Sequence, residues 1–174
     1  LTIDGQTFAQ GERVLISTNS SVLESEVTAP LVFVGYGVSA GNRNHDDYAD
    51  IDVEGKIVVV VNGVPDIFPS EERAHHNSGT TKRNNAAANG AVGMITISGW
   101  SDEQVAGIVQ GFASRPQVRL TAATGPSSLE QVSASATVSA ARGAELFEGA
   151  EMSLEEVRGA MSAEEGATFP RFDL

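Results

Sequence analysis

The 174 residues of this chain suffice for one domain with a hydrophobic core, and 41% hydrophobic with 20% charged residues is typical of globular proteins. The formal net charge of -12 argues against nucleic acid or an anionic membrane as partner, because both reward patches of lysine and arginine. The absence of cysteine excludes disulfides and thiolate zinc sites, and no apolar run is long enough to span a membrane.

Three strands are predicted in the first part of the chain. Residues 13–18 form an apolar strand, residues 22–28 a polar alternating strand, and residues 31–36 a third strand after a proline. The third carries Val32, Val34 and Tyr36 on one face and Leu31 and Phe33 on the other, which predicts burial on both faces. Since the chain begins at Leu1 without a methionine or signal peptide, we expect a piece of a longer protein.

The strongest strand signal is the run of five β-branched residues at 57–61. Its lack of alternation predicts a sheet covered on both sides. A long polar connection over residues 63–81 follows, which we expect to be a surface loop, and then a helix over residues 82–89 that ends at Gly90. Residues 91–98 return to strand, so the order strand, helix, strand predicts a right-handed crossover and parallel pairing.

Shorter elements are predicted in the second half of the chain. They are a short helix around residues 103–109, strands at residues 117–122 and 132–140, a helix over residues 141–148 that stops at Gly149, and a last helix from Ser153. Ser153 and Glu156 have the spacing of a capping box, in which each side chain accepts from the other residue's amide.

Two clusters carry residue types that bind metal ions. Glu71, Glu72, His75 and His76 superficially offer a zinc site, but the HExxH and HxxEH patterns are missing and the flanking residues predict a solvated surface loop. An acidic stretch offers oxygen ligands for Ca²⁺ without the spacing of an EF-hand loop, and we interpret it as a solvent-facing turn stabilised by its aspartates. Its acidic residues are Asp46, Asp47, Asp50, Asp52 and Glu54.

Nucleophilic and cofactor chemistry find no support in the sequence. A Gly-x-Ser-x-Gly elbow, a P-loop and a dinucleotide fingerprint are all missing. Tyr36 is interpreted as a core or edge aromatic, and Trp100 as a partly buried packing residue with a partner-binding anchor as the alternative. The sequence therefore predicts no catalytic, cofactor-binding or metal-binding residue in this chain.

Four pieces of sequence, in this order, carry a family resemblance. They are Val32-Phe33-Val34-Gly35-Tyr36-Gly37, Asp46-Asp47-Tyr48, the stretch 52–60, and the stretch 82–95 through Ala86 and Gly90. Their order and spacing resemble the protease-associated (PA) domain of zinc aminopeptidases of the M28 type over most of residues 29–98. Residues 144–150 and the helix from Ser153 resemble the segment that leads from such a domain back to the peptidase. Residues 65–81 depart from the family's pattern.

The resemblance implies an α/β fold of the β/β/α type, with two packed, partly barrel-like sheets of mixed parallel and antiparallel strands and a few flanking helices. It implies a PA-like domain at residues 1–140, with its core at 29–140, and a helical return segment at 141–174 toward a missing peptidase domain. The parent's two zinc ions and their ligands would lie in that missing domain, so no catalytic residue carries over.

The function implied is that of a non-catalytic lid or protein-interaction module that influences substrate access in an exported enzyme, extracellular or periplasmic. Its partners would be the catalytic domain of the same polypeptide and peptide or protein substrates. The alternative is an independent metal-binding or hydrolase domain that uses Glu71, Glu72, His75 and His76.

Overall fold

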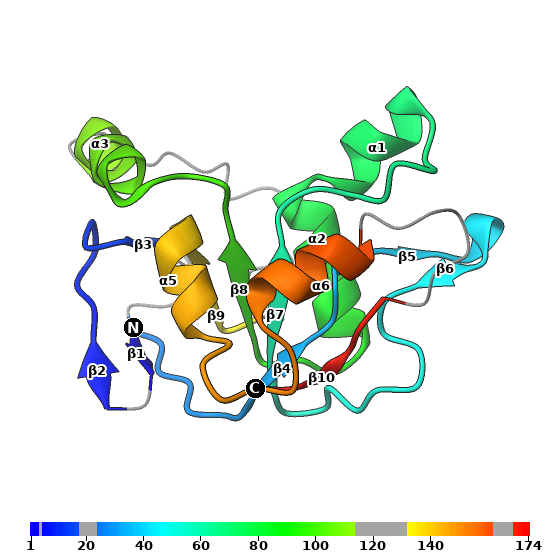
Figure 1. Ribbon diagram of the computed structural model, residues 1–174. Helices are drawn as coiled ribbons and strands as arrows, with labels where there is room; N and C mark the ends of the chain where they lie inside the picture. The colour runs from blue at the N-terminus through cyan, green and yellow to red at the C-terminus, as the bar shows by residue number, and fades with distance from the viewer. Residues whose placement is uncertain (4, 18–23, 114–131, 162–168) are drawn as a thin grey trace.

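A six-stranded mixed sheet forms the centre of the computed structural model, which describes residues 1–3, 5–17, 24–113, 132–161 and 169–174 (Figure 1). The strand order is β10-β4-β7-β8-β9-β3. The strands are β3 (Val14–Ser17), β4 (Leu31–Phe33), β7 (Ile57–Val61), β8 (Gly93–Ile97), β9 (Ala134–Val138) and β10 (Phe172–Asp173). The four inner strands are parallel, and both edge strands pair antiparallel to them.

Two small hairpin sheets and helices surround this sheet. The hairpins are β1 (Thr2–Ile3) with β2 (Gln6–Thr7), and β5 (Ser39–Ala40) with β6 (His45–Asp46), the latter enclosing the 3-10 helix η1 (Gly41–Arg43). The α-helices are α1 (Ser70–His76), α2 (Gly79–Ala88), α3 (Asp102–Ala113), α5 (Ala140–Glu145) and α6 (Leu154–Met161). None of the described helices is long and apolar enough to cross a membrane.

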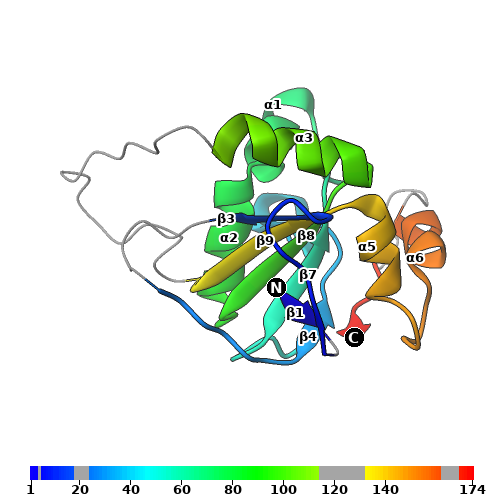
Figure 2. The ribbon, with the colours of Figure 1, turned by 90° about the vertical axis from the view of Figure 1, so that its left-hand side faces the viewer.

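Helices cover both faces of the sheet. Figure 2 shows α2 on one side of the sheet and α5 and α6 on the other, while α1 and α3 lie beyond the carboxyl ends of β7 and β8 (Figure 1). In the described residues it is helices, and not a second large sheet, that cover the six strands. The mixed α/β class expected from the sequence is confirmed.

β7 is the central strand and divides the core as its sequence predicts. Val58 and Val60 belong to the cluster under α2, while Val59 and Val61 belong to the cluster under α5 and α6, with Ile57 packed against it. Val58, Val59 and Val60 are fully buried. A strand with apolar residues at every position suits this place, because both of its faces meet packed side chains.

Close approach of α5 to the sheet depends on Gly143. A Cβ at this position would lie 2.2 Å from Cγ2 of Ile97 on β8. Only a glycine at this position therefore allows α5 to lie so close to β8.

Most predicted elements are found. β3, β7, β8, β9, α2 and α3 lie at the expected places, and β7 pairs in parallel with β8. Gly90 follows the C-cap of α2 with a positive φ angle, as predicted, whereas α5 ends at Glu145 and not at Gly149. The capping box is confirmed, since the Ser153 amide donates to Glu156 Oε2 at 2.8 Å and the Glu156 amide donates to Ser153 Oγ at 3.3 Å.

Four predictions about the fold need correction or fall outside the described residues. Residues 24–28 form no strand, while residues 22–23 and the predicted strand at 117–122 are not described. The connection 63–81 contains α1, so it is not a plain loop. Tyr36 does not share the face of Val32 and Val34, because the chain leaves the strand at Gly35, whose φ is +75°, and the ring packs against Phe169.

Candidate functional site

The Gly35-Tyr36-Gly37 loop follows β4 at the carboxyl edge of the sheet. Gly35 and Gly37 have φ angles of +75° and +71°, which favour glycine. A Cβ on Gly37 would lie 2.8 Å from Cγ1 of Val60, so the loop runs closely along β7. The amide of Val61 donates to the carbonyl of Gly35 at 2.9 Å and ties the loop to that strand.

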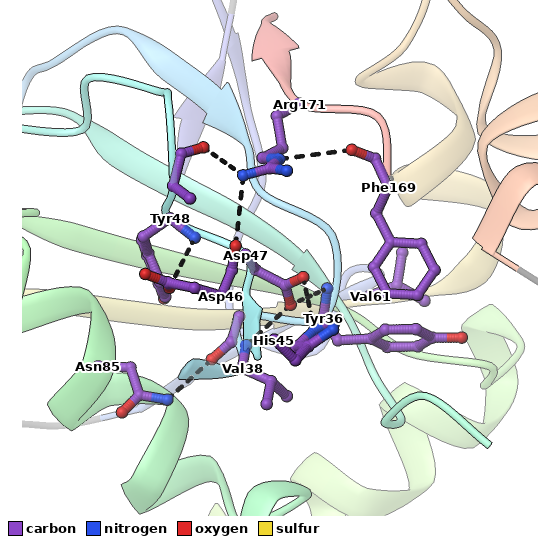
Figure 3. A network of polar contacts seen from close by, with 12 residues as sticks. Tyr36, Val38, His45, Asp46, Asp47, Tyr48, Val61, Asn85, Phe169 and Arg171 are labelled. Carbon is purple, nitrogen blue, oxygen red and sulfur yellow. Dashed lines mark hydrogen bonds and ion pairs between the residues drawn. The ribbon is translucent and has the colours of Figure 1, made fainter. Parts of the chain in front are cut away.

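Asp47 holds this loop from the other side (Figure 3). Its Oδ2 accepts from the amides of Tyr36 at 3.0 Å and Val38 at 2.9 Å. Its Oδ1 lies 2.9 Å from Nε2 of His45, without the alignment of a hydrogen bond. Asp47 is 2% exposed, so the carboxylate is satisfied by backbone amides in place of water.

Helix α2 contributes two polar side chains to the same edge. Nζ of Lys82 donates to the carbonyls of Gly63 at 2.7 Å and Val61 at 3.3 Å, and Nδ2 of Asn85 donates to the carbonyl of Gly37 at 3.1 Å. Burial lowers the pKa of Lys82 to about 8, although the nearby Asp47 carboxylate acts in the opposite direction. The two loops after β4 and β7 are thus fixed from one helix.

Residues near the C-terminus complete the arrangement. Arg171 Nη1 donates to the carbonyls of Ala49 and Asp46, and its Nε donates to the carbonyl of Phe169 at 3.4 Å (Figure 3). The ring of Phe169 meets Tyr36 edge-on with a centroid distance of 5.7 Å. Segments more than a hundred residues apart therefore position the Tyr36 ring together.

A pocket of about 280 Å³ lies beside this ring. It is lined by Tyr36, Asn62, Gly63, Val64, Arg73, Ala74 and Asn77. Its walls come from the two loops at the carboxyl edge and from α1. In parallel α/β sheets this edge is the usual place for ligand binding. Burial raises the pKa of Tyr36, with further contributions from Asp66 and Asp47, so its phenol stays protonated at neutral pH.

Three contacts hold α1 over the pocket. Arg43 donates through Nε and Nη2 to the two carboxylate oxygens of Glu72 at 2.9 and 2.7 Å. The ring of His76 packs against Phe68 with a centroid distance of 5.1 Å. The amide of Gly63 donates to Oδ1 of Asn77 at 3.2 Å. The pocket wall is consequently an anchored helix.

The proposed zinc cluster is not assembled. Glu72 is engaged by Arg43, which lowers the pKa of its carboxyl, while Glu71 and His75 are exposed. His76 is 9% exposed, and burial lowers its pKa, so the prediction of a solvated loop was wrong for this residue. The reason is that α1 forms and turns His76 inward. Within the described ranges no group of three or more His, Cys, Asp or Glu side chains is placed to hold a metal ion.

The acidic stretch is partly a turn, as interpreted. Asp46 Oδ1 accepts from the amide of Tyr48, and Asp52 Oδ1 accepts from that of Glu54, both at 3.1 Å. Asp47 is the exception, because it is buried and does not face solvent.

Sequence reasoning also missed Lys82 and the pocket. The available signal was two polar residues, Lys82 and Asn85, three apart and leading into an alanine-lined helix.

Comparison with known families gives one match. The family described as PA domain matches residues 27–145, which is more than half of the chain. This range includes the glycine-tyrosine loop, Asp47, α1 and α2, and hence every residue that lines the pocket. Comparisons with curated proteins and with solved structures give no match.

Proposed function

The chain belongs to the PA domain family, a kind of accessory module of proteases, and on this premise we propose that it serves a secreted zinc aminopeptidase of the M28 type. In this role it carries no chemistry of its own. Its pocket beside Tyr36 contacts peptide substrates or the catalytic domain of the same polypeptide and influences which peptides reach the zinc centre. The order of the four sequence pieces supports this parentage.

The observation that carries the proposal is the pocket at the carboxyl edge, whose walls are held by hydrogen bonds. Its tyrosine is displayed by a loop that Asp47 and Asn85 fix, and its outer wall is α1. Such preorganised concave surfaces bind with less loss of conformational entropy than mobile loops. Tyrosine offers a large apolar area together with a polar end, which suits contact with peptides of varied sequence.

Two zinc ions would belong to the parent's catalytic domain. The described residues of this chain do not fit them, since no group of suitable side chains is gathered at one point and Glu72 and His76 are engaged elsewhere. The chain's own contribution is therefore binding and positioning, and the independent hydrolase finds no supporting observation among the described residues.

The test uses the parent enzyme with its pocket filled. Ala74 is exposed on α1 and lines the pocket, so Ala74→Trp places a large side chain there. We expect KM to change by threefold or more for some members of a peptide panel, with kcat for a single-residue substrate unchanged. Ala88→Trp, an exposed position at the end of α2, is the matched control and should leave every KM unaltered.

Unchanged KM values for both variants across all peptide lengths would remove the role in substrate access. The accessory role is tested separately. The purified domain with added Zn²⁺ should hydrolyse no aminoacyl substrate, and turnover that is lost in Glu71→Ala or His75→Ala would contradict the accessory role.

A further inference from the structure

The three histidines of the chain form one cluster around Phe68. The Phe68 ring has its centroid 5.7 Å from that of His45 and 5.1 Å from that of His76. The ring of His75 lies next to that of His76, with a centroid distance of 4.9 Å. His45 belongs to β6 and the other two belong to α1, so this histidine cluster connects the β5–β6 hairpin with the helix that forms the outer wall of the pocket.

The surroundings of His76 suit a neutral ring. Its side chain is buried and packs on Phe68, which forms an apolar cluster with Val38, Ala40 and Val64. Its Nδ1 is buried and has no hydrogen-bond partner among the described residues. A proton at this atom would therefore place a charge and an unpaired N–H group in an apolar contact, which costs free energy.

Two of the neighbouring groups would repel a charge on His76. They are the titratable rings of His75 on the same helix and His45 on the hairpin. Burial lowers the pKa of His76 below its ordinary value, and both rings lower it further, while the carboxylate of Glu72 acts in the opposite direction. The contact between α1 and Phe68 is therefore made by the unprotonated form of His76.

The acidic side chains nearby are already engaged in contacts of their own. They are Glu72 with Arg43, Asp47 with His45 and the loop amides, and Asp66 with Arg73. The two hydrogen bonds from Arg43 hold the Glu72 carboxylate, so it compensates a charge on His76 only in part. The same pair lowers the pKa of Glu72, so this second anchor of α1 persists to lower pH than the His76 contact.

We propose that the histidine cluster is an acid-sensitive contact, and that protonation of His76 releases α1 from Phe68. The helix has seven residues and no side-chain hydrogen bond at its N-cap, so it depends on tertiary contacts. Arg73, Ala74 and Asn77 of α1 line the pocket, so release removes the outer wall. The effect on peptide access rests on the proposed function, whereas the release itself does not.

The direction of the pH dependence follows from the two states of the helix. In the released helix His76 meets water and has its ordinary pKa of 6.5, while in the packed helix its pKa is lower. The released state thus binds a proton more readily. Release should grow as the pH falls below 6.5 and should level off below the pKa of the packed ring.

Native-state hydrogen exchange at about pH 7.5 and about pH 5 tests this proposal. The amides of Arg73 and Asn77 donate to backbone carbonyls at the two ends of α1. Their protection factors, which correct for the pH dependence of chemical exchange, should fall at least about threefold at the lower pH. The amides of β8 should keep their protection. In an NMR titration, the ring of His76 should show a midpoint below 6.5.

Three variants make the test specific. His76→Phe keeps a ring against Phe68 and removes the titration, and His76→Gln removes it with a neutral polar side chain, so neither should lose protection of α1 in acid. His75→Gln changes an exposed ring of the same helix and should still lose it.

Equal protection of α1 at both pH values would overturn the proposal. A loss in acid that both His76 variants share with the unmodified chain would also overturn it, because His76 would then not be the group that titrates. An equal loss in β8 would assign the effect to unfolding of the whole domain and count against a local release. Because peptide kinetics do not enter this experiment, its failure is distinct from failure of the proposed role in substrate access.

Discussion

Asp47 accepts a hydrogen bond from the backbone amide of Tyr36 at 3.0 Å, although eleven positions separate the two residues in the chain. The same carboxylate oxygen accepts from the amide of Val38. An acidic residue from a polar turn thus decides the shape of the loop that displays the tyrosine. The shape of the loop beside the pocket therefore depends on the Asp47 side chain.

Replacement of Asp47 tests this dependence. Asp47→Ala leaves the buried amide of Val38 and the partly buried amide of Tyr36 without acceptors, so we expect the free energy of unfolding to fall by about 2–4 kcal/mol. Asp47→Asn keeps one acceptor oxygen and should cost less. Urea unfolding measures both. Asp52→Ala removes a comparable hydrogen bond at an exposed turn and should cost under about 1 kcal/mol; an equal loss in both alanine variants would contradict the special role of Asp47.

Because Lys82 is buried, we expect the free energy of unfolding to rise with pH. Burial lowers its pKa from 10.5 to about 8, so above pH 8 the unfolded chain holds more protons than the folded one. The free energy of unfolding should therefore rise by roughly 2 kcal/mol between pH 8 and pH 10. The measurement stops at pH 10, because burial raises the pKa of Tyr48 and stability falls as pH increases beyond the ordinary tyrosine value.

Urea unfolding at several pH values measures this rise, with two variants as controls. Lys82→Met should lose the rise in the same window. Lys56→Met changes a partly exposed lysine paired with Asp173 and should keep it. A rise of the same size in both variants would assign the effect to other groups.

A charged substitution on β7 tests the central position of this strand. Val59→Asp buries an unpaired carboxylate in the core that also contains Phe33 and Val157, so folding should be lost or weakened by more than about 4 kcal/mol. Val59→Ala should remain folded and lose about 2 kcal/mol. Ile67→Asp, at a position 42% exposed, should change little. Circular dichroism and urea unfolding give the readout, and a cooperatively folded, equally stable Val59→Asp protein would contradict the layer assignment.

Two helical glycines should respond in opposite directions to the same substitution. Gly143→Ala forces a methyl group into Ile97 and should destabilise the fold by about 1–3 kcal/mol. Gly159→Ala on α6 meets nothing within 4 Å and should stabilise it by about 0.5–1 kcal/mol, because alanine favours the helix. Thermal unfolding compares them, and a gain at both positions would show that α5 can shift outward without cost.

The elements predicted well from sequence are those whose local pattern agrees with their environment. β7 is β-branched throughout and buried on both faces, and the last helix carries its own capping box. α1 was missed because it has seven residues, no side-chain cap at Pro69 and no apolar periodicity. It is held by tertiary contacts of Glu72 and His76, which composition does not reveal.

The site itself was beyond sequence reasoning for a related reason. Asp47 stands among other acidic residues and differs from them only because the backbone amides of Tyr36 and Val38 face it. In the sequence Lys82 resembles any lysine on a helix surface. Only the structure shows that its Nζ is bound by the loop after β7. Since α1 packs through His76 on Phe68, deletion of residues 70–78 would remove a buried side chain and expose Phe68.

Lys82 and Asn85 also have a dynamic consequence. The two side chains join α2 to the loop after β4 and to the loop after β7, so the helix cannot leave the sheet without releasing both. We expect these three segments to open as one cooperative unit in native-state hydrogen exchange, with a common opening free energy and a common dependence on denaturant. Opening of the carboxyl edge would then be an all-or-none event that involves α2 and both loops.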